Sequence, residues 1–109
     1  MNKGNKMKIK LSDFGCTDGN AVLCPNCGEP YLHHEKVEIF ERGEDEEFGI
    51  HAQVENGVLT TDTNLTGNPS ARRHGMLIHF SCEGCTETSV LSLEQHKGTT
   101  YIEMKIRKN

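Results

Sequence analysis

The chain of 109 residues has no tryptophan, only six aromatic residues and only three prolines. Large apolar side chains supply much of the burial free energy of a core, so a domain of this size with few of them gains little stability from packing. No apolar run approaches the roughly 20 residues that cross a membrane. Residues 1–15 also lack the apolar centre of a secretory signal. We therefore expect one cytoplasmic domain, residues 1–109, that needs a further stabilising constraint.

Cysteine supplies the clearest candidate for that constraint. Four of the five cysteines form two Cys-x-x-Cys pairs, LCPNCG at 23–28 and FSCEGC at 80–85, and 54 residues separate Cys27 from Cys82. Each such turn places two sulfurs about a tetrahedral edge apart, and Zn²⁺ takes four such ligands at about 2.3 Å. We expect one structural Zn²⁺. Its expected ligands are Cys24, Cys27, Cys82 and Cys85.

Other readings of the cysteines are weaker. A redox Cys-x-x-Cys requires a helix N-terminus within an α/β pattern, which the sequence does not show. His33-x-Glu35 matches part of a zinc-deaminase motif, but it lies in an expected strand and Ser81 rather than proline precedes Cys82. The odd cysteine, Cys16, is expected to be a small, partly buried residue, with a replacement ligand or a reactive thiol as alternatives. The remaining histidines are expected on the surface.

Alternation of apolar and polar residues, without any sustained helical period, predicts a mainly β fold of six or seven short antiparallel strands. The expected elements are strands at 6–11, 31–41 and 76–82 and hairpins at 48–61 and 88–107. Asn56-Gly57 supplies the turn of the first hairpin, with Val54 opposite Leu59. Residues 62–75 are polar and are expected to form a mobile loop.

Through L-C-P-N-C-G at 23–28 and F-S-C-E-G-C at 80–85, the chain resembles the zinc-ribbon family. The resemblance implies two knuckles, each on a β-hairpin, that share one structural zinc. The usual gap between the pairs is about 15–20 residues, so the hairpin at 48–61 is expected to be an insertion. ERGEDEE and LEQHKG are similar to segments of small uncharacterised proteins of bacteria and phages.

Charge is distributed unevenly along the chain, whose net charge is −4. The first ten and last five residues carry seven basic and no acidic side chains, whereas all 16 acidic residues lie between them. If the strands at 6–11 and 101–107 were adjacent, their basic residues would share one face and could contact phosphate. The candidate nucleic-acid contacts are Lys6, Lys8, Lys10, Arg72, Arg73, Tyr101, Lys105 and Arg107. Lysines that protect edge strands from aggregation are the alternative.

The acidic middle of the chain favours a protein partner over nucleic acid. Glu44–Glu47 is interpreted as a solvated loop, or alternatively as an acidic surface for a basic partner. We expect a non-enzymatic regulatory or accessory protein that binds a protein partner and uses zinc structurally, with a phage or a mobile element as the suggested origin. Exposed strand edges make a homodimer possible. The alternative function is nucleic-acid binding through the basic terminal strands.

Overall fold

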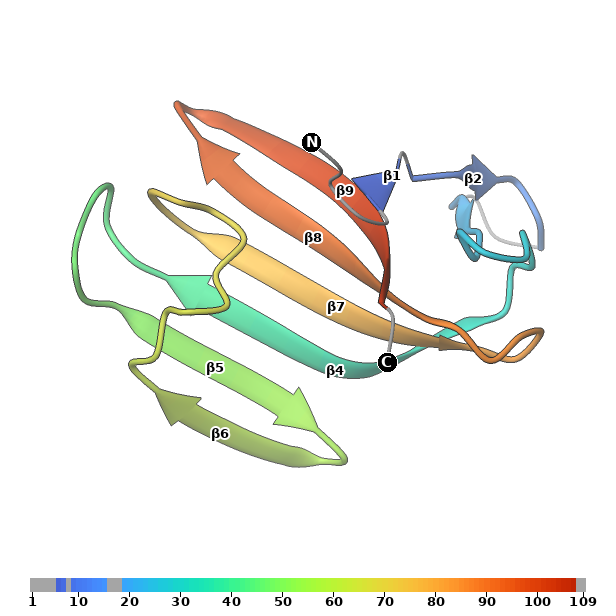
Figure 1. Ribbon diagram of the computed structural model, residues 1–109, viewed down its shortest axis with the longest axis horizontal. Coiled ribbons are helices and arrows are strands. Elements are labelled where there is room, and N and C mark those ends of the chain that lie inside the picture. The colour runs from blue at the N-terminus through green and yellow to red at the C-terminus, as the bar shows by residue number, and fades with distance from the viewer. Residues whose placement is uncertain (1–5, 8, 16–18, 108–109) are drawn as a thin grey trace.

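The computed structural model describes residues 6–7, 9–15 and 19–107, and all of their regular structure is β-strand (Figure 1). Among these residues there is no helix that could cross a membrane. The strands are β1 (Lys6–Met7), β2 (Leu11–Ser12), β3 (Ala21–Val22), β4 (Leu32–Glu41), β5 (Ile50–Glu55), β6 (Val58–Asp62), β7 (Gly75–Cys82), β8 (Thr88–His96) and β9 (Thr99–Arg107). The predicted mainly β, antiparallel fold is confirmed.

Seven of the strands form one antiparallel sheet in the order β1-β9-β8-β7-β4-β5-β6. β4 is flanked by β5 on one side and by β7 on the other. The hairpin that was expected as an insertion therefore extends the main sheet at its edge (Figure 1). β2 and β3 pair with each other in a separate two-stranded sheet.

Both predicted hairpins are confirmed, and their turns explain their registers. Asn56 and Gly57 both have positive φ, 53° and 76°, as a two-residue type I′ turn requires. Val54 pairs with Leu59, as expected. Lys97 and Gly98, with φ of 52° and 81°, turn β8 into β9 in the same way.

Two details of the predicted fold are wrong. Residues 6–11 are not one strand, because Lys6 and Met7 pair with β9 whereas Leu11 and Ser12 pair with β3. The alternating pattern fixes which face a side chain occupies but not which strand becomes its partner. For the same reason the first knuckle is not on a hairpin: it connects β3, in the small sheet, to β4 in the large one.

The main sheet has one apolar and one polar side, since directly paired residues share a face and successive residues alternate. One row of paired positions crosses the sheet as Met104, Leu91, Ile78, Val37, Val54 and Leu59. The next row on that side is Ile102, Leu93, Met76, Ile39, Ala52 and Thr61. We call these two rows the apolar face.

The opposite side, which we call the polar face, is made of the three alternating rows. They are Lys105-Val90-His79-Lys36-Glu55-Val58, Glu103-Ser92-Leu77-Glu38-Gln53-Thr60 and Tyr101-Glu94-Gly75-Phe40-His51-Asp62.

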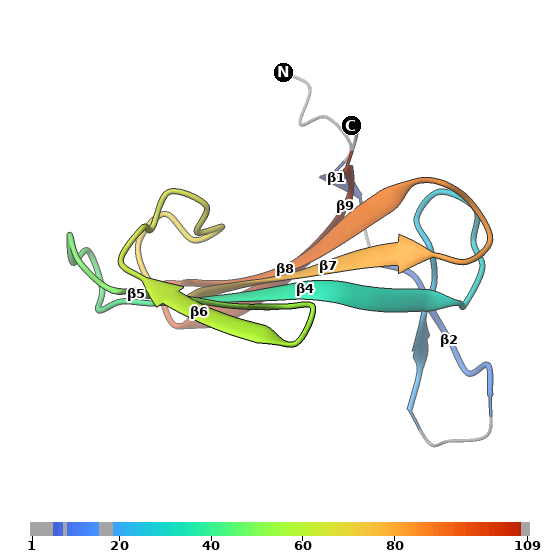
Figure 2. The ribbon, with the colours of Figure 1, turned by 90° about the horizontal axis from the view of Figure 1, so that it is seen from below.

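The segment between β6 and β7 lies over the polar face, whereas β2 projects from the other side of the sheet (Figure 2). Ser70 is buried, and its hydroxyl donates to the carbonyl of Gln95 at 2.7 Å. A Cβ on Gly75 would lie 2.1 Å from the Asn68 Oδ1 atom, so the loop approaches β7 closely. These contacts place part of the loop expected at residues 62–75 against the sheet.

In the middle of the sheet a charged side chain is buried while an apolar side chain next to it is exposed. The carboxylate side chain of Glu38 on the polar face is 13% exposed, whereas its neighbour Ile39 on the apolar face is 45% exposed. Phe40 and Met104 are the largest fully buried side chains among the described residues. The loop thus covers the polar face, and much of the apolar face stays open to solvent.

Candidate metal centre

The first cysteine pair lies on a tight turn between β3 and β4. The carbonyl of Cys24 accepts a hydrogen bond from the Gly28 N–H at 2.9 Å, and the Cys24 N–H donates to Glu29 at 2.9 Å. Gly28 has φ of 81°, in the left-handed region that glycine adopts without strain. This turn holds Cys24 buried and Cys27 exposed.

The second pair lies between β7 and β8, which are adjacent strands. The Gly84 N–H donates to the Cys82 sulfur at 3.2 Å, as expected of a metal-binding turn. A Cβ on Gly84 would lie 2.8 Å from the Glu29 Cγ atom and 3.4 Å from the Cys27 sulfur. The two knuckles are therefore so close that a side chain at position 84 would collide with the first of them.

Pairing of β4 with β7 brings the two knuckles together. Leu32, near the start of β4, pairs with Cys82 at the end of β7. The Glu83 N–H donates to the Tyr31 carbonyl at 3.1 Å and continues this contact beyond the strands. The long segment between the cysteine pairs runs away from the first knuckle along β4 and returns antiparallel to it along β7, so both pairs lie at the same end of the sheet (Figure 1).

The four predicted ligand sulfurs form one cluster, all within 4.8 Å of one another. The Cys24 and Cys85 sulfurs are 3.8 Å apart, and the Cys27 and Cys82 sulfurs are 3.6 Å apart. Sulfurs placed about 2.3 Å from a central ion in a tetrahedron have edges of about 3.8 Å. A disulfide has an S–S distance of about 2.05 Å, so neither of these pairs is bonded. The cluster has the size and donor set to hold one metal ion.

The pKa values of the cysteine thiols reflect how close the four sulfurs lie to one another. The backbone N–H of Glu29 lowers the pKa of Cys27, but burial and the other three thiols outweigh it and raise that pKa to about 12. Hydrogen bonds from the Asn26 side chain and the Glu87 backbone lower the pKa of Cys85 to about 7. Four thiolates this close repel one another, and a divalent cation removes that repulsion by binding them all.

The predicted nucleic-acid contacts do not all come together. Lys6 pairs with Lys105, so the expected adjacency of the terminal strands exists at this position. Tyr101, Lys105 and Arg107 share the polar face with the acidic residue Glu103. Lys10 lies outside β1, immediately before β2. Lys8 and the odd cysteine, Cys16, lie outside the described residues.

Arg72 and Arg73 are directed toward the acidic segment 44–47 instead. Arg72 donates from Nε and NH2 to the two carboxylate oxygens of Asp45, at 2.9 and 2.7 Å. The side-chain hydrogen bond from Arg72 holds the pKa of Asp45 below its usual value. Arg73 lies 4.0 Å from Glu44. Part of the acidic segment therefore forms ion pairs with the loop between β6 and β7, within the same chain.

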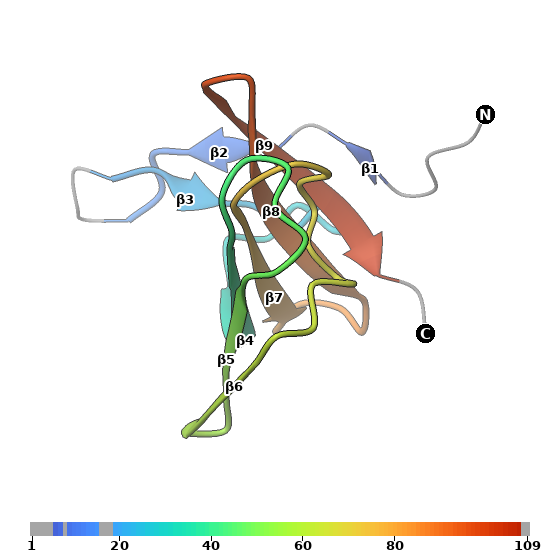
Figure 3. The same cartoon turned by 90° about the vertical axis from the view of Figure 1, so that its left-hand side faces the viewer.

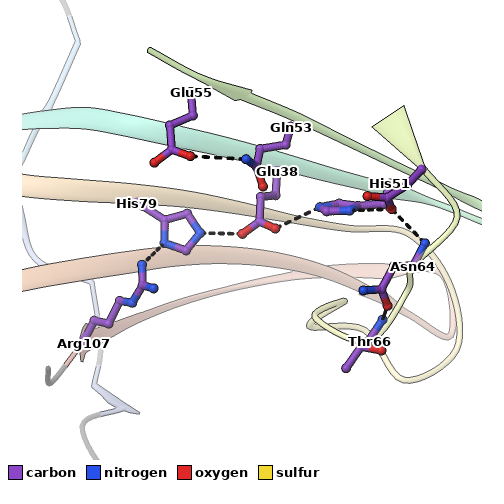
Figure 4. A network of polar contacts seen from close by, with 9 residues as sticks. Glu38, His51, Gln53, Glu55, Asn64, Thr66, His79 and Arg107 are labelled. Atoms are coloured by element: carbon purple, nitrogen blue, oxygen red, sulfur yellow. Dashed lines mark hydrogen bonds and ion pairs between the residues drawn. The ribbon is translucent and has the colours of Figure 1, made fainter. Parts of the chain in front are cut away.

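Sequence reasoning missed a buried chain of polar groups on the polar face (Figure 4). Glu38 accepts hydrogen bonds from His51 at 2.9 Å and from His79 at 2.7 Å. His51 also contacts Asp62 at 3.0 Å, and Arg107 donates to the second nitrogen of His79 at 2.9 Å. The expectation that these histidines lie on the surface is wrong, because His79 is only 7% exposed. No signal in the sequence distinguished Glu38, because it alternates with Val37 and Ile39 as a solvent-facing residue of a strand does.

The hydrogen bonds assign different charges to the two histidines. His51 donates to a carboxylate from each nitrogen, which requires a protonated ring. Burial lowers its pKa, but the bonds to Asp62 and Glu38 outweigh burial, so the pKa of His51 is raised. His79 accepts from Arg107, which requires a neutral ring, and burial above all lowers the pKa of His79. Burial raises the pKa of Glu38, but the two histidine bonds outweigh it and lower that pKa.

His33, part of the partial deaminase motif, is not in the cysteine cluster. It forms an exposed pair with Glu83, which follows Cys82 in the second knuckle. The described four-cysteine cluster includes no histidine or carboxylate.

In an NMR titration of the imidazole rings, we expect His51 to titrate above its ordinary value of 6.5 and His79 below it. His51 therefore stabilises the fold fully below pH 6.5, and its contribution is lost as pH rises through the folded-state pKa. Asp62→Asn should lower the pKa of His51, whereas Asp45→Asn, in the other ion pair, should not. A folded-state pKa for His51 below that of His79 would contradict this charge assignment.

Comparison with protein-family models, curated proteins and solved structures finds no match for this chain. The resemblance to zinc ribbons therefore rests on the two knuckles, and their geometry supports a four-cysteine metal site.

Proposed function

We propose that this protein is a non-enzymatic module that carries one structural Zn²⁺ and binds a protein partner, as a small regulatory or accessory protein does. The proposal has two parts. The cysteine cluster supplies the metal site, and the open apolar face of the sheet supplies the binding surface.

Zinc suits the cluster because of its donors and their number. Four thiolates are soft ligands, which zinc accepts and which magnesium and calcium avoid. Four sulfurs also complete the tetrahedral coordination of zinc and leave no position for a water molecule or substrate. The proposed role of the ion is therefore structural, since catalytic zinc requires an open position.

Elemental analysis of the purified protein should find about one zinc per chain. Structural zinc contributes about 10–16 kcal/mol in small domains, comparable with or above the 5–15 kcal/mol of a typical fold, so chelation should unfold the protein and added zinc should refold it. Cys27→Ser should lower the zinc content, whereas Cys16→Ser should not. A protein that stays fully folded without metal would refute the structural role.

One observation carries the proposal of a protein partner: the apolar face is open where the polar face is covered. Its exposed side chains include Ile39, Val54, Leu59 and Ile102, with Leu59 66% exposed. Large exposed apolar patches are characteristic of binding surfaces. Ile39, Met76 and Leu93 also line a groove of about 230 Å³ at the end of the sheet, together with Glu41, Glu94 and other residues.

A photo-cross-linking amino acid at position 59 should yield protein adducts in the cells that produce the protein. Position 58 is a matched control, because Val58 is 58% exposed in the same hairpin but lies on the opposite face. Equal adduct yields from the two positions, or none from position 59, would reject this binding surface.

Pairing of Lys6 with Lys105 favours nucleic-acid binding as a second candidate function. Like charges directly opposite each other in a sheet are destabilising, and phosphate would relieve their repulsion. The apolar face plays no part in this alternative.

If the basic strands bind nucleic acid, the affinity for double-stranded DNA should fall steeply with salt concentration in fluorescence anisotropy. Lys6→Glu with Lys105→Glu should reduce the logarithmic salt slope by about 2, because each lost phosphate contact removes about 0.9. Lys36→Glu with Lys97→Glu, which changes the net charge equally, is the control. Absence of binding to DNA and RNA at low salt would exclude this function.

A further inference from the structure

Within residues 6–7, 9–15 and 19–107, no second layer covers the apolar side of the main sheet. Sheets in folded domains bury an apolar face against another sheet or against helices. Here the segment between β6 and β7 lies over the polar face, and β2 projects from the apolar side only near one end (Figures 2 and 3). Leu91 and Met104 are buried at the β8–β9 side of the apolar face. From Ile102 across Ile39 to Leu59 the face is open.

The chain exposes more surface than a compact monomer of its mass. The accessible surface is 7315 Å², whereas a compact monomer of this mass exposes about 6,100 Å². The radius of gyration, 14.7 Å, is likewise above the roughly 13 Å of a compact chain of this length.

The distribution of charge identifies the chemistry of the partner. The two rows of the apolar face contain no charged side chain, whereas the polar face carries Lys36, Glu38, Glu103 and Lys105 among others. A nucleic acid or a strongly charged protein surface would therefore find no counter-charge in these two rows; Glu41, one position further along the same side of β4, lies outside them. A second copy of the two rows is complementary to them, because it is equally uncharged and equally apolar.

Each chain has a net charge of −4, so two copies repel at long range. Association through the apolar face keeps this repulsion small at close range. In face-to-face packing the charged side chains of both polar faces point away from the interface. A two-fold axis makes such an interface self-complementary, since the same residues meet from both sides.

We propose that this chain forms a symmetric dimer in which the apolar faces of two seven-stranded sheets pack against each other as a β-sandwich. In such sandwiches the sheets lie about 10 Å apart and cross at about 30°. The inference rests on the proposed function, because it names a second copy of the chain as the partner of the same surface. It uses the face of the sheet, not the strand edges that the sequence suggested as the route to a homodimer.

Sedimentation equilibrium of the zinc-loaded protein across a concentration series tests the dimer. The mass should approach twice the 12.2 kDa of one chain. Leu59→Glu and Ile39→Glu should each weaken dimerisation by on the order of 100-fold, because each buries an unpaired charge in the interface. Val58→Glu, on the opposite face of the same hairpin, should leave the dissociation constant unchanged.

Zinc content and circular dichroism establish that each variant is folded. If Ile39→Glu fails to fold, Leu59→Glu decides the result, because Leu59 is 66% exposed and its replacement creates no cavity. A wild-type chain that stays monomeric at the highest concentration overturns the inference. A dimer that tolerates Leu59→Glu but is lost with Thr60→Pro, at the β6 edge, also overturns it.

The outcomes separate this inference from the proposed function. A monomeric chain whose position 59 still cross-links to a different protein refutes the dimer and leaves the protein-binding function standing. A monomeric chain without such adducts removes both. A dimer in which position 59 cross-links to a second copy supports both.

Discussion

The antiparallel pairing of β4 with β7 is the constraint on which the rest of the structure depends. It places Leu32 opposite Cys82 and so carries two turns that are distant in the sequence to one end of the sheet. Four sulfurs then lie within 4.8 Å of one another. A metal ion bound there joins the two ends of a long chain segment, whose closure in an unfolded chain costs conformational entropy. A metal ion in this cluster would therefore stabilise the pairing that builds its site.

The same pairing separates the polar side of the sheet from the apolar side. Glu38 and His79 meet across β4 and β7 on the polar face, where the hydrogen bonds of Glu38 compensate its burial. On the other side of the same strands, Ile39 pairs with Met76 and stays half exposed. Hydrogen bonding thus compensates the buried charges of the covered polar face, whereas part of the apolar face stays exposed to water, which is unfavourable for apolar side chains.

Local signals in the sequence predicted much of this architecture. Alternation at Val54, Asn56-Gly57 and Leu59 gave the correct hairpin and register, since a two-residue turn fixes which residues face each other. The four ligand cysteines could be named because their spacing is itself the signal. The strand expected at 6–11 was wrong for the opposite reason: its alternation was real, but its two halves pair with different strands.

By itself, the sequence determined the elements whose causes lie within a few residues: most of the strands, the tight turns and which four cysteines are candidates for one metal site. Only the tertiary structure decided which strands are neighbours, that the segment between β6 and β7 covers the charged side of the sheet, and that His51 and His79 are buried around Glu38. Alternation along a strand divides side chains between two faces, but it carries no information about which face another segment will cover. That depends on contacts between residues distant in the chain.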